Sequence, residues 1–292
     1  MMKKYRYIMF LLLAVFVATS CFSEDKQADN NEETPELKEG HLFIIGGGDR
    51  PDSLMTQYLA LGGGSKARVL IVPFASSDIE DTGSYQQEQF ARLGCASSEY
   101  VNSPKKLIDS EESLAKLDGV TAVFFSGGDQ NRLTDYLQGT KFLAKIREIY
   151  KNGGVIGGTS AGAAVMSKIM LTGEEENVPD KYKGDFSYIK QGNVQTAEGF
   201  GFIDSAIIDQ HFIIRKRQNR LISLVLERRM KGVGIDEATA IIVKPDGSFR
   251  VAGQSQVMVF EPEAQPTISP TGYLKTNSLN VRILTAGDTY QL

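Results

Sequence analysis

The sequence predicts an α/β protein with a mostly parallel central sheet, helices on both faces of the sheet, and antiparallel strands at one edge. Short β-branched or aromatic runs alternate with helical patterns from residue 41 onward, which is typical of βαβ units. The run ARVLIVPFAS, residues 67–76, is almost continuously apolar, as expected of a strand buried on both faces. After residue 243, short strands separated by turns such as PDG favour antiparallel pairing.

The elements follow in order along one domain, residues 41–292, in which no internal boundary or repeat is visible. Strands are predicted where apolar runs end in glycine, and helices where apolar residues recur with helical spacing. A long polar stretch, residues 172–199, is predicted to be an irregular loop. The predicted strands are 41–49, 67–76, 119–130 and 233–243, the helices are 85–93, 131–137, 141–150 and 217–230, and residues 154–166 form a strand, a turn and a helix.

Length and composition are those of an ordinary globular protein. The chain has 292 residues, of which 41% are hydrophobic and 23% charged, enough for one large domain with a sizeable core. Its net charge of −4 comes from charges of both signs spread along the body, which does not support nucleic-acid binding. Of the two cysteines, Cys95 has no evident disulfide partner.

The N-terminus predicts an export signal. Basic residues precede a short apolar stretch, residues 7–18, and the small residues of VATSC lead to Cys21. This pattern resembles a bacterial lipobox, which implies that residues 1–20 are a lipoprotein signal peptide and that Cys21 is acylated. We therefore expect a lipid anchor in the bacterial cell envelope, on the periplasmic or surface face. The alternative is a plain secretory signal with an incidental cysteine.

Residues 21–40 are predicted to be a disordered tether. The stretch is polar, mostly acidic and free of aromatic residues after Phe22, so it cannot bury enough apolar surface to fold. The folded domain therefore begins near residue 41.

The strand–turn–helix at residues 154–166 contains GTSAG, in which Ser160 is flanked by small residues. The pattern G-x-S-x-G is typical of a nucleophile elbow, where a sharp turn lifts the serine oxygen above the sheet. Glycine-rich turns of this kind also bind phosphate through backbone N–H groups, which is the alternative. The segments SGGDQ and GTSAG both lie at the carboxyl ends of predicted strands, where open α/β sheets bind ligands.

A nucleophilic serine needs a base, and the chain has only two histidines. His41 opens the first strand and is expected at the surface. His211, between a strand and a helix in IIDQHFIIRKRQNR, is the base by elimination, the alternative being a structural histidine.

The base needs an acid, and two candidates end an otherwise apolar strand. Asp236 and Glu237 are costly to bury there unless they have partners. Glu174–Glu176, in the long polar stretch, are rivals. Backbone N–H groups of Ala161 and of Gly127 or Gly128 are suitable oxyanion donors.

Four segments together, FFSGGDQNRL, GGTSAGAAVM, DQHFIIRKRQNRL and GIDEATA, resemble the cyanophycinase family of serine peptidases. That family also holds aspartyl dipeptidase and is related in fold to class I glutamine amidotransferases. The similarity covers about residues 41–260. It implies nucleophile Ser160, base His211 and acid Glu237, a homodimer, and no metal or organic cofactor. It further implies that the substrate pocket is formed by Gln130, Asp209, Gln210, Arg215, Arg217 and Arg220.

The resemblance also implies a substrate: a poly-aspartate whose β-carboxyls carry arginine, cleaved to β-aspartyl-arginine, or a related β-aspartyl peptide. Three arginines suit a carboxylate-rich substrate, and Asp209 could receive a guanidinium; alternatively, RKRQNR is only the basic face of a helix. The acidic stretch GEEENVPDKYKGD departs from the family pattern. Three other functions remain: a serine peptidase of different aspartyl-peptide specificity, a lipase-type hydrolase, and a non-catalytic envelope-binding lipoprotein.

Overall fold

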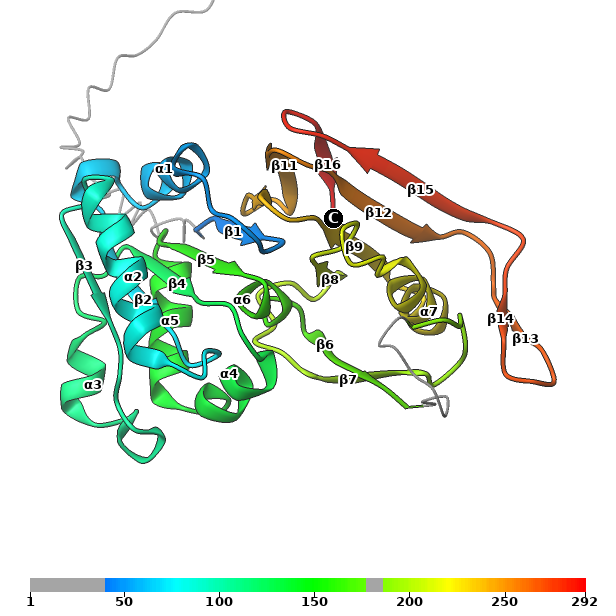
Figure 1. Ribbon diagram of the computed structural model, residues 1–292, viewed down its shortest axis with the longest axis horizontal. Helices are drawn as coiled ribbons and strands as arrows, with labels where there is room; N and C mark the ends of the chain where they lie inside the picture. Colours follow the sequence, from blue (N-terminus) through cyan, green and yellow to red (C-terminus); the bar gives the residue numbers. More distant parts are fainter. Residues whose placement is uncertain (1–39, 177–185) are drawn as a thin grey trace, which may run out of the picture. The chain divides into compact units, whose positions relative to one another are not determined.

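The large sheet consists of five parallel strands extended by antiparallel strands at one edge, as the sequence predicts. The computed structural model describes residues 40–176 and 186–292, and Figure 1 shows their arrangement. Each parallel strand is a short apolar run, such as LFII and AVFF. In spatial order the strands are β16 (Thr289–Gln291), β11 (Ser248–Gly253), β10 (Thr239–Val243), β1 (Leu42–Ile45), β5 (Val155–Thr159), β4 (Ala122–Phe125), β2 (Arg68–Val72) and β3 (Ser97–Tyr100).

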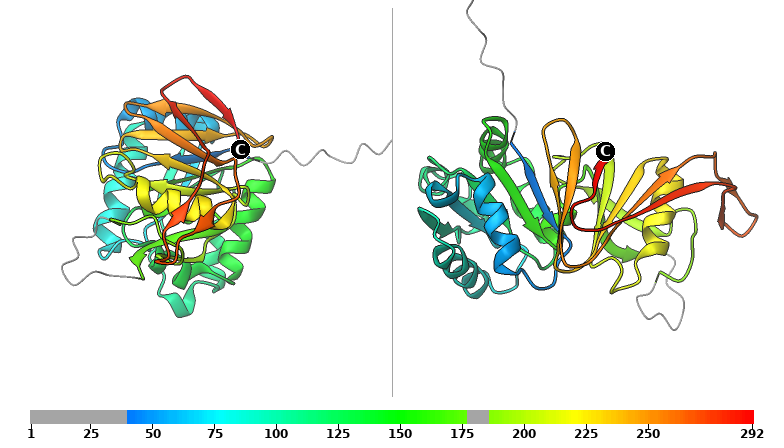
Figure 2. Two further views of the ribbon diagram at one scale, coloured as in Figure 1. Left: turned by 90° about the vertical axis from the view of Figure 1, so that its right-hand side faces the viewer. Right: turned by 90° about the horizontal axis from the view of Figure 1, so that it is seen from above.

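Helices cover both faces of the parallel part of this sheet, because neighbouring side chains in each strand point to opposite faces. Phe43 and Ile45 of β1 pack with α1 and α2, whereas Leu42 and Ile44 pack with α4, α5 and α6. Figure 2 shows α1 and α2 in blue and cyan on the opposite side from the green α5. The helices are α1 (Asp52–Leu61), α2 (Ile79–Arg92), α3 (Glu111–Ala115), α4 (Gln130–Leu137), α5 (Lys141–Lys151), α6 (Ala161–Ala164) and α7 (Gln218–Arg228), with 3₁₀ turns η1 (Gly64–Lys66) and η2 (Lys105–Leu107).

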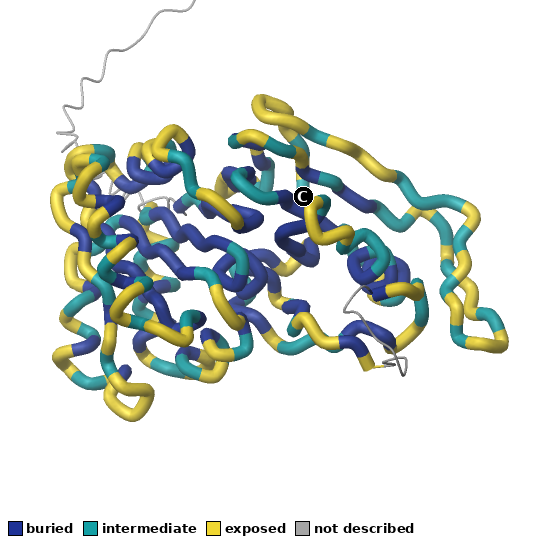
Figure 3. The backbone as a smooth tube through the Cα atoms, in the orientation of Figure 1, coloured by how far each residue is buried: buried dark blue, intermediate teal, exposed yellow. Residues whose placement is uncertain are grey.

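A second sheet of four strands, which the sequence does not predict, packs against the same core as α4 to α6. Helix α7 covers its other face, where Leu221 and Leu224 belong to one hydrophobic cluster with Ile207 and Phe260. Figure 3 shows that β8 and β9 are mostly buried and that β15 is made of exposed and intermediate residues. Its strands are β15 (Leu279–Leu284), β12 (Val257–Pro262), β9 (Lys231–Ile235) and β8 (Ala206–Gln210), and two hairpins complete the fold: β6 (Ile169–Glu175) with β7 (Val194–Glu198), and β13 (Thr267–Ile268) with β14 (Leu274–Lys275).

Two predicted elements are wrong in detail. The expected single strand 233–243 is two strands, β9 and β10, which belong to different sheets and are joined by residues 236–238. The break is sharp because Ala238 has a left-handed backbone with φ 51°. The expected loop 172–199 contributes residues 172–175 to β6 and residues 194–198 to β7; residues 177–185 lie outside the described part of the chain.

The predicted signal peptide, the lipidated Cys21 and all of the tether except Gly40 lie outside the described residues. Gly40 belongs to the folded part, because it is buried and its N–H donates to the carbonyl of Tyr150 at 2.7 Å. Within residues 40–176 and 186–292, no helix has the length and apolar character needed to cross a bilayer.

Candidate active site

Ser160 stands at a sharp turn where β5 ends and α6 begins. Its backbone has φ 53° and ψ −108°, a conformation that a residue with a side chain rarely adopts. Small neighbours make the turn possible, because a Cβ on Gly158 would lie 2.3 Å from the carbonyl oxygen of Gly162. A Cβ on Gly162 would in turn lie 2.2 Å from the carbonyl oxygen of Phe125. The turn therefore has the shape of a nucleophile elbow, with the serine oxygen raised at the carboxyl edge of the sheet.

Three side chains form one hydrogen-bonded line at this edge. His211, which follows β8, has its Nε2 2.8 Å from Ser160 Oγ. Its Nδ1 is 2.5 Å from Glu237 Oε1. A proton on Nδ1 donates to the carboxylate, which leaves the Nε2 lone pair free to accept the serine hydroxyl proton. Such a line can convert a serine hydroxyl into a nucleophile.

The two acids at the β9–β10 connection have different partners. Asp236 is buried, and its Oδ1 accepts the backbone N–H groups of residues 213–214, both at 3.0 Å. Its Oδ2 accepts the hydroxyl of Ser255 at 2.7 Å. Asp236 therefore fixes the turn that follows His211, whereas Glu237 contacts the imidazole itself. The rival Glu175 is buried in β6, where it accepts the side-chain amide of Asn193 at 2.6 Å.

Three glycines after β1, whose importance sequence reasoning missed, make room for this line. The N–H of His211 donates to the carbonyl of Gly46 at 2.7 Å, and the N–H of Ala238 donates to the carbonyl of Gly47 at 2.9 Å. A Cβ on Gly47 would lie 2.3 Å from Cε1 of the imidazole, and one on Gly48 would lie 2.8 Å from Glu237 Oε2. The sequence shows a glycine triplet at the end of a strand, but it does not show which side chains these glycines leave room for.

Burial lowers the pKa of His211 below its usual 6.5. The hydrogen bond that His211 donates to Glu237 opposes this shift, while the nearby cations Arg215 and Arg217 lower the pKa further. Burial dominates because the side chain is only 8% exposed and the charged imidazolium is poorly solvated there. The ring is therefore neutral at neutral pH, the state in which it can accept a proton.

The expected oxyanion donors lie beside the serine. A Cβ on Gly127 would be 3.3 Å from Ser160 Cβ, so the backbone after β4 passes close to the hydroxyl. Gly128 has φ +139°, and a Cβ on it would collide with the carbonyl of Ala75 at 2.2 Å. Ala161 opens α6, so its N–H has no partner within the helix.

A cavity of about 250 Å³ opens beside Ser160 and holds most of the expected pocket residues. Gln130 Nε2 donates to the carbonyls of Leu171 and Thr172 at 2.9 and 2.7 Å, so its amino group holds β6 in place. The polar lining from α4, β6 and the β8–α7 connection consists of Asp129, Gln130, Asn131, Thr172, Glu174, Gln210, Arg215, Arg217 and Arg220. Asn131, Thr172 and Glu174 were not predicted as pocket residues.

The arginines differ in how far they are neutralised. Arg217 Nη1 donates to the backbone and side-chain oxygens of Gln210, both at 2.8 Å, so its contacts are with uncharged groups. Burial, followed by the neighbouring Arg220, lowers the pKa of Arg217 to about 10. Arg215 is exposed and has no ion-pair partner among the described residues. Two cations therefore face the cavity without a carboxylate.

Asp209 and Arg220 bind each other, and of the two only Arg220 lines the cavity. The Asp209 carboxylate is 0% exposed and binds Arg220 in a two-point ion pair, with Arg220 Nε 2.8 Å from Oδ2. It also accepts the N–H of Gln210 at 2.7 Å. Asp209 is thus occupied within the protein and does not line the cavity, which corrects the expectation that it receives a substrate guanidinium.

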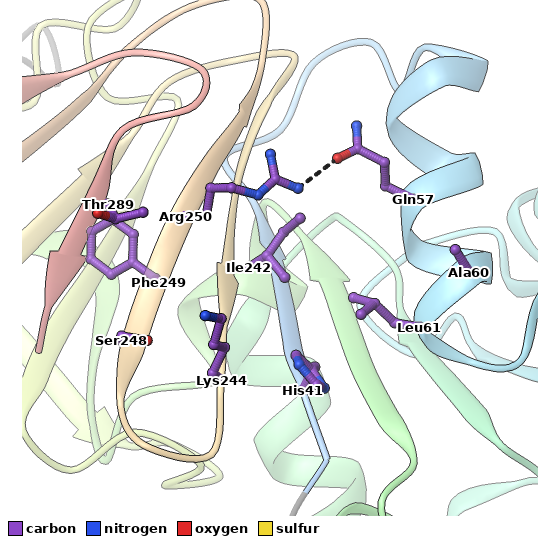
Figure 4. A pocket seen from close by; sticks show the side chains of 10 residues that line it. All are labelled: His41, Gln57, Ala60, Leu61, Ile242, Lys244, Ser248, Phe249, Arg250 and Thr289. Carbon is purple, nitrogen blue, oxygen red and sulfur yellow. Dashed lines mark hydrogen bonds between the residues drawn. The ribbon is translucent and has the colours of Figure 1, made fainter.

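A larger cavity of about 400 Å³ lies at the other end of β1, between α1 and strands β10 and β11 (Figure 4). His41 lines it, close to Lys244, and Arg250 donates to Gln57 Oε1 at 3.0 Å across it. His41 is therefore remote from Ser160. Within the described ranges, no group of three or more His, Cys, Asp or Glu side chains is arranged to hold a metal ion.

Comparison with known protein families shows that peptidase family S51 matches residues 42–251. A cyanophycinase of Synechococcus elongatus is 31% identical over 91% of this chain and 84% of its own length. A cyanophycinase of Trichormus variabilis is 30% identical over 89% of this chain and 88% of its own length.

Two solved structures share the fold. A peptidase from an acI-B1 Actinobacterium has a TM-score of 0.65 and 24% identity, covering 88% of this chain and 98% of its own. A putative peptidase E protein from Listeria monocytogenes EGD-e has a TM-score of 0.52 and 17% identity, covering 74% of this chain and 100% of its own.

Proposed function

Because the chain belongs to peptidase family S51 and is a serine-type peptidase, we propose that it cleaves β-aspartyl peptides, or an aspartyl-arginine polymer, through Ser160, His211 and Glu237. The observation that carries this proposal is the hydrogen-bonded line of these side chains beside a cavity lined by arginines. Membership of this family leaves the lipase-type hydrolase and the non-catalytic binding lipoprotein without support.

In the acylation step, Ser160 Oγ attacks the carbonyl carbon of the scissile amide while His211 Nε2 takes the hydroxyl proton. Glu237 keeps the other imidazole proton on Nδ1 and stabilises the imidazolium. The backbone N–H groups of Ala161 and Gly128 bind the oxyanion of the tetrahedral intermediate. The imidazolium then gives its proton to the leaving amine, the amide bond breaks, and an acyl ester on Ser160 remains.

Water completes the cycle. His211, neutral again after acylation, removes a proton from a water molecule that attacks the ester carbonyl. The second tetrahedral intermediate uses the same oxyanion donors. When it collapses, the proton returns from His211 to Ser160 Oγ and the carboxylic acid product leaves. The lowered pKa of His211 favours both steps, because each begins with a neutral imidazole.

Substrate carboxylates bind Arg215 and Arg217, the two cavity cations without a carboxylate partner. A planar guanidinium can hold a carboxylate through two parallel N–H donors, which a lysine cannot do. The relatives at about 30% identity are cyanophycinases, which supports an aspartyl-arginine substrate for this chain too. The lipid anchor at Cys21, the envelope location and a homodimer belong to this proposal as expectations from the sequence.

The proposal is tested by incubating the chain with cyanophycin, with β-aspartyl-arginine and with the α-linked isomer, and identifying products by mass. We expect cleavage of the β-linked substrates and loss of turnover by several orders of magnitude in His211→Ala, because the three side chains act as a unit. His41→Ala is the matched control and should retain activity. Cleavage of α-linked peptides alone would refute the proposed specificity, and equal effects of the two histidine variants would refute the mechanism.

A further inference from the structure

Two sets of side chains with opposite charge, here called two walls, line the cavity beside Ser160. One wall comes from the β8–α7 connection and carries Arg215 and Arg217. The other wall comes from β6 and from the start of α4 with its N-cap, and it carries two exposed carboxylates, those of Asp129 and Glu174. No ion pair in the described part of the chain involves either carboxylate, so a positively charged group entering the cavity would meet unneutralised acids.

An irregularity in β6 brings Glu174 to this wall. Leu171 pairs with Thr196 and Glu175 pairs with Val194, so residues 172–174 stand opposite a single residue of β7. Gly173 has φ +99°, which allows the strand to bulge there. Bulges of this kind are common next to active sites, where they redirect a side chain. Here Glu174 lines the cavity while its neighbour Glu175 is buried.

The bulge is held by side chains at the start of α4. Gln130 Nε2 donates to the carbonyls of Leu171 and Thr172, and Asn131 Nδ2 donates to that of Thr172 at 3.4 Å. Gln130 is itself buried, so its position is fixed by packing. The wall that carries Glu174 is therefore attached to α4, the helix that begins two residues after Gly128.

Of the two acids on this wall, Glu174 is better placed to bind a ligand. Asp129 Oδ1 accepts the N–H of Asn131 at 2.9 Å and caps α4. Within residues 40–176 and 186–292, neither carboxylate oxygen of Glu174 accepts a hydrogen bond, whereas its backbone N–H donates to Thr172 Oγ1. Glu174 thus has its full hydrogen-bonding capacity available to the cavity.

We propose that Glu174 determines specificity by binding a cationic group of the substrate, a guanidinium or an ammonium, while Arg215 and Arg217 hold a carboxylate. The preferred substrate is then a short peptide that carries both charges, oriented across the cavity with its scissile carbonyl at Ser160. This inference rests on the proposed function, because it assigns a role in recognising the substrate of that reaction.

The test compares two substrates of the same shape, β-aspartyl-arginine and β-aspartyl-citrulline, in which an uncharged ureido group replaces the guanidinium. For Glu174→Gln, kcat/KM for the arginine substrate should fall by about ten- to a hundredfold, as expected for loss of a charge-assisted hydrogen bond. The citrulline substrate should be cleaved as by the parent. Glu174→Asp, which keeps the charge, should restore part of the preference.

Two variants are controls. Glu176→Gln removes an exposed carboxylate two residues away that does not line the cavity, and it should retain the preference for arginine. Asp129→Asn removes the other acid of this wall and should alter the preference less than Glu174→Gln does. An unchanged arginine-to-citrulline ratio in Glu174→Gln, or its collapse in Asp129→Asn alone, would overturn the inference and leave the proposed function intact. If the parent cleaves neither of these dipeptides nor cyanophycin, the proposed function fails and the inference fails with it.

Discussion

The space that a side chain at Gly47 would need is filled by the imidazole of His211. A Cβ added to Gly47 would lie 2.3 Å from Cε1 and 2.4 Å from Nε2 of that ring. Carbon atoms in contact stay about 3.5 Å apart, so the ring must move by about 1 Å. Nε2 is the atom that faces Ser160 Oγ at 2.8 Å, so the movement separates the proposed base from the proposed nucleophile. A misplacement of this size costs about a hundredfold in rate, which is the loss expected for Gly47→Ala.

Backbone strain must be separated from this steric effect, because Gly47 has φ +115°. A residue with a side chain is strained there by about 1–3 kcal/mol, which could lower stability without touching the site. Gly94 is the matched control: its φ is +85°, and a Cβ on it would meet no atom within 4 Å. Both alanine variants should melt at a lower temperature than the parent, but only Gly47→Ala should lose activity.

The assay is kcat/KM for the β-aspartyl substrate, with labelling of Ser160 by a fluorophosphonate as a second readout. Both should fall in Gly47→Ala at temperatures where circular dichroism shows it folded. If Gly47→Ala is as active as Gly94→Ala, the imidazole does not need the space that this glycine leaves, and the argument from close approach is wrong.

Three further predictions concern the acid, the base and the N-terminus. Glu237→Gln should lower turnover about ten-thousandfold, as loss of the orienting carboxylate does in other triads, and a loss below tenfold would contradict its role. Because the pKa of His211 is lowered, the neutral base persists into mild acid, so kcat/KM should fall only below pH 6.5. Arg215→Gln removes a cation that lowers this pKa, so the acid limb should move to higher pH; no movement would show that Arg215 does not act on the imidazole. Cys21→Ala should abolish labelling by a fatty-acid probe, and persistent labelling would refute the lipid anchor.

The parallel sheet could be predicted from the sequence because its strands are short apolar runs separated by helical patterns. The second sheet could not, since the apolar character of VGIDEATAIIV continues across the point where the chain leaves it. The break is marked only by the left-handed backbone of Ala238, and an alanine in the sequence does not predict a left-handed conformation. The β6–β7 hairpin was missed because residues 172–175 are polar.

Residue types alone narrowed the choice of candidate site residues. Two histidines left one plausible base, and the structure brings it to Ser160. The family resemblance was needed to assign Glu237 rather than Asp236 as the acid. The two residues are adjacent, and the sequence does not show which side of the turn each one faces. The pairing of Asp209 with Arg220 was not foreseen, since it joins the end of a strand to a helix eleven positions later.

The connection between β9 and β10 passes from one sheet to the other, and Glu237 lies on it. Ser160 follows a strand of the large sheet, whereas His211 follows a strand of the second sheet. The two hydrogen bonds of the imidazole therefore span the junction of the sheets, and their lengths depend on how the sheets are aligned. A small shift of one sheet relative to the other would therefore change enzymatic turnover. Spectroscopic measurements of helix and strand content would not detect such a shift, because both sheets would keep their secondary structure.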